Sequence, residues 1–190
     1  MSKKLNKMAN LSRTNLRSTR DFKNVLDSVK INSDFKYIST SDDYDYSGLE
    51  VGDYTIVVNV AMADGKFIRL PEATTSNAGM KIKVLIALSP ADNMHVGFVT
   101  TNIVGGVHGV SDATEGVAAG YLRSSAVGDA NLRMTLDVDG AAGDGAGYPG
   151  TCINFTYVGV ENSVFVDGYL LGDVDSATGA NVFNTTAVNA

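Results

Sequence analysis

The sequence predicts an all-β protein, an antiparallel β-sandwich or jelly-roll-like body preceded by an extended basic N-terminal arm that contains one short helix. Short runs rich in β-branched residues recur after residue 54, glycine-rich turns separate them, and no stretch after residue 31 keeps a 3.6-residue apolar period. Roughly seven or eight short strands at regular spacing are typical of sandwiches and jelly rolls rather than α/β enzymes. We expect three segments: an arm (1–30), a linker (31–53) and a β-body (54–190).

The charge of the chain is strongly divided. The whole sequence carries a formal charge of −6, from 15 Lys and Arg against 21 Asp and Glu. Residues 1–30 hold eight basic and two acidic residues, a net of +6, so the other 160 residues hold seven and 19, a net of −12. A basic arm of this kind is suited to an acidic surface, whether nucleic acid, lipid headgroups or protein. The alternative is a solvated terminus without a partner.

Part of the arm has the pattern of a short amphipathic helix over residues 20–30. Ser18 or Thr19 can cap it, and Asp21 complements the dipole in the first turn. A helix of about three turns is marginal in isolation, so it needs a surface to pack on. Four apolar residues recur at i, i+3, i+4 and i+7 and form its packing face: Phe22, Val25, Leu26 and Val29.

The linker alternates acidic and aromatic residues and has little capacity to form a core. Tyr37, Tyr44 and Tyr46 are characteristic of it, and we expect the segment to run extended over a surface. Its tyrosines can dock on a neighbouring subunit, since Tyr is enriched at interfaces, or they can cover the body of their own chain. The sequence does not decide between these two interpretations.

The body begins with two predicted strands, Tyr54–Val60 and Phe67–Leu70. The Asp64-Gly65 pair between them is typical of a type I′ hairpin turn. Pro71 ends the pairing, and a polar loop follows over residues 72–79. Glycine-rich turns separate the remaining predicted strands, which are Lys81–Leu88, Val96–Val104, Leu132–Val138, Cys152–Val158 and Val164–Leu171.

The residues that carry chemistry do not form a catalytic pattern. His95 and His108 both lie in turn-like contexts, and no nucleophile motif accompanies them. Cys152 falls in a predicted strand, where a buried structural thiol is expected, and a single cysteine excludes an internal disulfide. The Asp-rich loop 137–148 departs from the EF-hand pattern at its fifth, sixth and twelfth positions. We therefore expect no enzymatic activity, no cofactor and no metal site.

The sequence also lacks the patterns of export and membrane insertion. Its basic start is not followed by the apolar run of a secretory signal, and no later run has the ~20 apolar residues of a membrane span. We expect synthesis in the cytoplasm and no membrane partner.

Three short motifs of the body resemble β-rich virion proteins of tailed bacteriophages. The first is Gly65-Lys-Phe-Ile-Arg-Leu-Pro-Glu-Ala73, followed by Gly79 and the strand Met80–Ile86. The others are Gly150–Tyr157 and Val166–Leu170, which are similar to the closing strands of those domains. The resemblance covers about residues 54–171. It implies a non-enzymatic virion component of the capsid decoration (cement) or head- or tail-fibre type, commonly a homotrimer.

The function that the sequence favours is capsid decoration. In this hypothesis the protein binds the outer surface of the capsid shell across capsomers, with the major capsid protein as its partner, and the arm is the attachment element. Three arms per trimer raise the effective concentration at the shell. Besides the packing face of the helix, we expect six basic residues to anchor it: Lys3, Lys4, Lys7, Arg13, Arg17 and Arg20.

Three other functions stay open at this point. A fibre or receptor-binding module would use surface loops such as 105–120 and 139–149 to bind carbohydrate or cells. A polysaccharide-degrading enzyme would need converging carboxylates, for which the spacing gives no support. A nucleic-acid binder would use the basic arm, but the net charge of −12 on residues 31–190 opposes close approach to DNA.

Overall fold

The computed structural model describes residues 33–111, 120–124, 130–137, 146–172 and 182–188, and the chain divides into residues 1–32 and 33–190. The regular secondary structure of the described part consists of strands and one 3₁₀ helix, η1 (Thr75–Asn77). The predicted arm, its helix and all ten expected anchoring residues lie outside the described residues.

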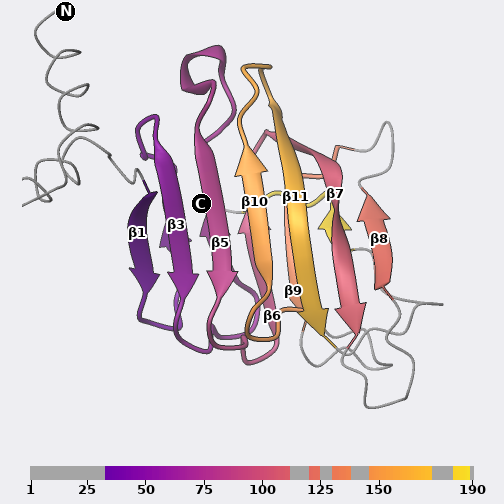
Figure 1. Ribbon diagram of the computed structural model, residues 1–190. Coiled ribbons are helices and arrows are strands. Elements are labelled where there is room, and N and C mark those ends of the chain that lie inside the picture. Colours follow the sequence, from indigo (N-terminus) through magenta and orange to yellow (C-terminus); the bar gives the residue numbers. More distant parts are fainter. Residues whose placement is uncertain (1–32, 112–119, 125–129, 138–145, 173–181, 189–190) are drawn as a thin grey trace, which may run out of the picture. The chain divides into compact units, whose positions relative to one another are not determined.

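A seven-stranded sheet forms the larger layer (Figure 1). Its edge strands are β1 and β8. In spatial order the strands are β1 (Ser33–Ile38), β3 (Asp53–Val58), β5 (Lys81–Ile86), β10 (Cys152–Thr156), β11 (Ser163–Gly172), β7 (Asn102–Ser111) and β8 (Gly120–Ser124).

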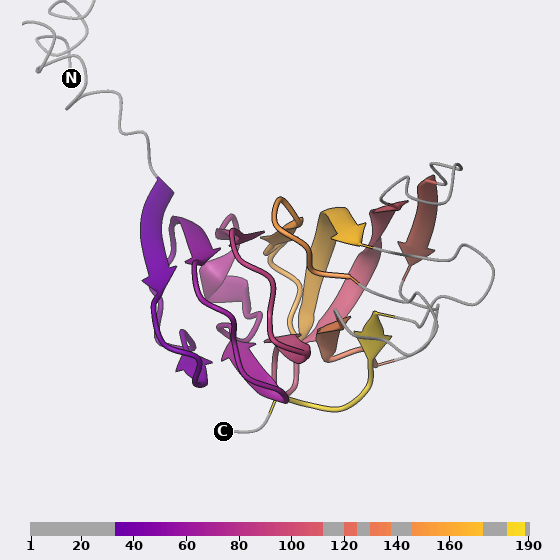
Figure 2. The same cartoon turned by 90° about the horizontal axis from the view of Figure 1, so that it is seen from below.

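A five-stranded sheet forms the second layer, and Figure 2 shows both layers from below. Its two edge strands, β12 and β2, have only two residues each. The order is β12 (Phe183–Asn184), β9 (Arg133–Asp137), β6 (Asn93–Gly97), β4 (Lys66–Arg69) and β2 (Tyr44–Asp45).

The expectation of antiparallel sheets is wrong, because both sheets are mixed. From β1 to β7 successive strands alternate between the two sheets, so neighbours within one sheet are separated by a strand in the other. Each of these strands therefore runs in the same direction as the previous strand of its own sheet. Thus β1, β3 and β5 are parallel to one another, as are β2, β4 and β6. Antiparallel pairs involve the later strands, for example β10 with β5 and β11.

The predicted hairpin between residues 54–60 and 67–70 is also wrong. Strands β3 and β4 lie in different sheets and do not pair. The turn itself exists, since Lys66 N donates to Ala63 O at 3.2 Å and Gly65 has φ of 71°. Asp64 has no positive φ, however, so the turn is not type I′. An Asp-Gly turn specifies a local reversal of the chain and not which strands then pair.

Most of the other strands are confirmed, but the predicted strand Val96–Val104 is two strands and not one. It comprises the end of β6 and the start of β7, in different sheets, with a crossing over residues 98–101. Phe98 is fully buried in this crossing, so the segment between the two strands also contributes to the core. His95 and His108 lie in β6 and β7, so their expected turn contexts are wrong as well.

The described part of the expected linker 31–53 contributes a strand to each sheet, β1 and β2. The interpretation that its aromatic rings cover the chain's own body is confirmed for two of them, and docking on a neighbouring subunit stays a prediction. Tyr44 and Tyr46 are partly buried and pack on the chain's own core, whereas Phe35 and Tyr37 on β1 are exposed.

One hydrophobic core joins the two sheets. Buried side chains from both form a single cluster, in which the Phe98 ring meets Phe155 and Tyr157 edge to face at 5.8 and 6.4 Å between centroids. The Tyr157 hydroxyl is satisfied at the end of β4, where it donates to Pro71 O at 2.8 Å. This arrangement fixes the layers and leaves the other face of each sheet for contacts outside the core.

Candidate functional site

The outward face of the seven-stranded sheet is the site that the structure points to. Successive side chains of a strand point to opposite faces of the sheet, and in β5 the burial follows this alternation: Ile82, Val84 and Ile86 are buried and Lys81 and Lys83 are exposed. The pairing register then places outward residues of successive strands in rows. We call this surface the open face, and its three rows run from β1 or β3 toward β7. The first row is Asp53, Lys81, Thr156, Phe165 and Val104; the second is Phe35, Thr55, Lys83, Asn154 and Asp167; the third is Tyr37, Val57, Leu85, Cys152, Tyr169 and His108.

A shallow concavity of about 370 Å³ lies on the first two rows, over β3, β5, β10 and β11. The lining residues Tyr54, Ile82 and Phe155 alternate with outward neighbours and pack on the core, so their backbones contribute the floor. The outward side chains that line it are Asp53, Thr55, Lys81, Lys83, Asn154, Thr156 and Asp167.

The charged groups of the concavity balance, with two lysines and two aspartates. Among the residues that the structure describes, neither Lys81 nor Lys83 forms an ion pair. Asn154 Nδ2 donates to Asp167 Oδ1 at 2.7 Å, which orients that carboxylate. Carboxylate, amide, ammonium and hydroxyl groups thus face the same opening, and the surface can both donate and accept hydrogen bonds.

Exposed aromatic rings flank the concavity in the two rows that form it. In the first row, Phe165 of β11 stands next to Thr156 of β10 and is 46% exposed. In the second row, Phe35 of β1 stands next to Thr55 of β3 and is 53% exposed. In the third row Tyr37 and Tyr169 are also exposed. Large exposed apolar side chains gathered on one face indicate a binding surface more than a solvated one.

Cys152 lies in the third row and is buried, as the sequence predicted. Burial raises the pKa of its thiol; the Lys83 charge opposes this and Asp167 reinforces it. A thiol with a raised pKa is a poor nucleophile, which fits a structural role.

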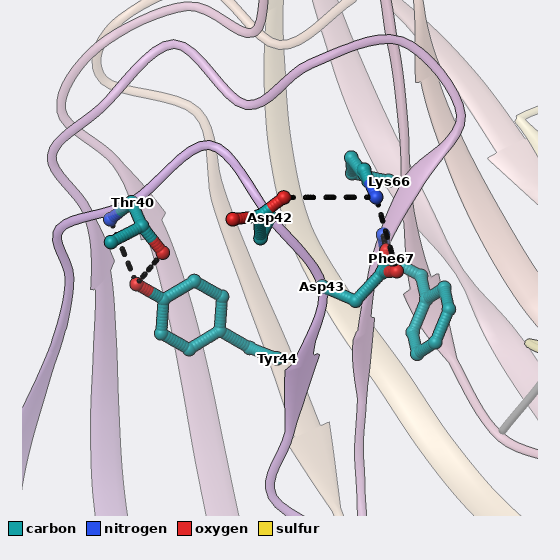
Figure 3. Close-up of polar contacts among 6 residues, drawn as sticks. All are labelled: Thr40, Asp42, Asp43, Tyr44, Lys66 and Phe67. Carbon is teal, nitrogen blue, oxygen red and sulfur yellow. Dashed lines mark hydrogen bonds and ion pairs between the residues drawn. The ribbon is translucent and has the colours of Figure 1, made fainter.

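A second cluster of charges lies between the loop 40–44 and the start of β4 (Figure 3). Asp43 accepts a hydrogen bond from Phe67 N at 3.0 Å, and Lys66 Nζ pairs with Asp43 at 3.3 Å and Asp42 at 3.8 Å. The Tyr44 hydroxyl contacts Thr40 Oγ1 at 2.9 Å and Thr40 N at 2.8 Å, and the Thr40 hydroxyl is the main cause of its lowered pKa.

Glu72 is the most heavily bonded carboxylate among the described residues. It accepts hydrogen bonds of 2.7 to 3.1 Å from the backbone N–H groups of Val99, Thr100 and Thr101 and from both threonine hydroxyls. Burial acts to raise the pKa of Glu72, but hydrogen bonds led by that from Thr101 outweigh it and hold the pKa below its usual value. The carboxylate thereby fixes the crossing between β6 and β7.

The structure brings together residues that the sequence did not single out as a site. Outward-pointing Lys81 and Lys83 were predicted from their alternation, but Asn154 and Asp167 come from β10 and β11, far along the chain. Only the strand register places them beside the lysines. Of the Asp-rich loop 137–148, residues 138–145 lie outside the described residues.

Searches of family models, curated proteins and solved structures found no match to this chain. Within the described residues, no helix has the length and apolar character to cross a membrane. The same part of the chain has no group of three or more His, Cys, Asp or Glu side chains placed to hold a metal ion.

Proposed function

We propose that the protein is a capsid decoration protein of a tailed bacteriophage, bound to the major capsid protein on the outer surface of the virion shell and assembled as a homotrimer. It acts by binding across capsomers, not by turnover. For the body we propose a β-sandwich. A jelly roll consists of antiparallel strands, and the parallel pairs in both sheets do not fit that connectivity.

The proposal is supported mainly by one observation: the boundary between the two structural units of the chain coincides with the boundary between its basic and acidic parts. The chain divides between residues 32 and 33, and the basic excess of +6 lies wholly before that point, while residues 33–190 carry −12. A cationic segment beside an acidic module suits attachment of the segment to an acidic surface, with the module held outside. The resemblance of the body to phage virion proteins supplies the identity of that surface.

The test is sedimentation of the full chain with empty shells of the major capsid protein from the phage that encodes it. We expect saturable binding to the shells. For the free protein in solution we expect the molecular mass of three chains. A full-length variant with Gln at Lys3, Lys4, Lys7, Arg13, Arg17 and Arg20 should lose binding. The control is Lys81→Gln with Lys83→Gln, which removes positive charge from the body only. Failure of the wild type to sediment overturns the function, and normal binding by the six-Gln variant overturns the role of the arm.

A receptor-binding module attached through the same arm is the second candidate. The concavity on the open face favours it, since a preformed polar surface with aromatic flanks is what ligand recognition requires. The two functions are compatible in one molecule, because the arm and the open face are separate parts of the chain.

A further inference from the structure

We propose that the concavity on the open face binds a neutral oligosaccharide. The inference names the ligand class of the receptor-binding candidate and rests on that candidate, not on attachment to a shell. Four features of the face lead to it: its balanced charge, its mixture of donors and acceptors, its aromatic flanks and its open shape.

The balance of charge selects against strongly charged ligands. An anion attracted by Lys81 and Lys83 is repelled by the two aspartates, Asp53 and Asp167, in the same concavity. A cation attracted by the aspartates is likewise repelled by the two lysines. A neutral ligand encounters no like charge. Its polar groups can be satisfied by all four side chains, since hydrogen bonds to charged groups are stronger than those between neutral ones.

The mixture of polar groups matches hydroxyls in particular. A sugar hydroxyl both donates and accepts, so neighbouring hydroxyls on one ring can donate to Asp167 and accept from Lys83. The Asn154–Asp167 hydrogen bond of 2.7 Å holds the acceptor in place before any ligand arrives. All of these side chains stand on strands, which reduces the ordering needed on binding.

The aromatic flanks supply the apolar part of the recognition. A sugar ring presents C–H groups on its faces, and burial of that apolar surface against an exposed aromatic ring is favourable. Phe35 begins the second row on β1, and Phe165 stands in the first row on β11, on the far side of the concavity. From β1 to β11 there are four strand spacings, about 19 Å in all.

The shape of the site favours an extended ligand over a small cofactor. Pockets for compact ligands enclose most of the ligand surface, whereas this concavity is open on a sheet face. A chain of several sugar units can lie across the strands, with units near Phe165 and Phe35 and polar contacts between them.

The experiment uses the full-length protein on a printed array of neutral and acidic glycans, followed by NMR titration of the ¹⁵N-labelled chain with the best ligand. We expect a neutral oligosaccharide to bind, with saturable shifts at the amides of Lys83, Asn154 and Asp167. Asp167→Ala and Phe165→Ala should each weaken binding about tenfold or more. Tyr169→Ala is the matched control: this ring is on the same strand as Phe165 and similarly exposed at 45%, but lies outside the first two rows.

Three results would overturn the inference. One is no binding to any glycan on the array. Another is binding of acidic glycans alone, abolished by Lys81→Gln with Lys83→Gln, which would make the concavity an anion site. The third is equal loss in Tyr169→Ala and Phe165→Ala, which would indicate a general change in the face. None of these results alters the sedimentation of the chain with shells, so the two proposals fail separately.

Discussion

Charged side chains in two regions of the molecule differ in what they bind. Around the β4 strand, Asp43 and Lys66 pair with each other, and Glu72 accepts five hydrogen bonds from residues 99–101. On the open face, Lys81 and Lys83 have no ion-pair partner among the described residues. The same residue types can thus either fix the fold or remain available to a ligand. Substitutions in the first region should therefore change stability, and those in the second should change binding.

The largest loss of stability is expected for Glu72→Ala. The substitution removes five hydrogen bonds and leaves three backbone N–H groups of the crossing to find water, so we expect a loss of about 2–4 kcal/mol in the free energy of unfolding. Urea unfolding of the full chain measures it. Glu161→Ala, at an exposed carboxylate, is the control and should change stability by less than about 0.5 kcal/mol. Equal stability of the two variants would show that the crossing does not depend on Glu72.

The contribution of Glu72 should also depend on pH. Its pKa is lowered in the folded state, so its ionised form stabilises the fold fully above the unfolded pKa of about 4.3. The stabilisation is lost as the pH falls through the folded pKa. The difference in unfolding free energy between wild type and Glu72→Gln should therefore be greatest near neutral pH and shrink below about pH 4. A difference that stays constant down to pH 2 would contradict this.

A smaller effect is expected for Asp43→Ala. It removes a hydrogen bond to the Phe67 backbone and a partly exposed ion pair with Lys66, and we expect a loss of about 1–2 kcal/mol. Lys66→Ala loses only the ion pairs and should cost less than about 1 kcal/mol. A double-mutant cycle in low and high salt separates the two contributions. The coupling should fall with salt, and an unchanged coupling would mean that packing, not charge, links the residues.

The sequence predicted where strands lie along the chain better than which strands pair with one another. The alternation in Lys81–Ile86 predicted a strand with outward lysines, and the structure has this pattern. The segments of β10 and β11 were likewise found from their composition. Which strands lie side by side is a long-range property, however, and the alternation of β1 to β7 between two sheets leaves no local signal. That is why a turn at Gly65 predicted a hairpin that does not exist.

The candidate site shows the same limit more sharply. Lys83 lies opposite Asn154, and Asn154 opposite Asp167, so the polar surface exists only through the register of three strands. At Gly168 in β11 φ is 137°, and a Cβ there would collide with the Cys152 carbonyl oxygen. Glycine is thus required where β11 approaches β10 closely, beside the site. A single sequence shows the glycine but not the strand that it approaches.

The smallest effect on stability is expected for Lys81→Gln combined with Lys83→Gln, although this pair removes more charge than Asp43→Ala. Glutamine keeps most of the aliphatic stem that covers the sheet, and no ion pair between described residues is lost. Residues 33–190 become more negative by two charges, from −12 to −14, which adds self-repulsion, but charges on an exposed face are screened beyond about 8 Å at physiological ionic strength. We therefore expect the unfolding free energy to change by less than about 0.5 kcal/mol. A loss above about 1 kcal/mol in urea unfolding would mean that the lysines stabilise the fold, and the contrast between the two regions would then be wrong.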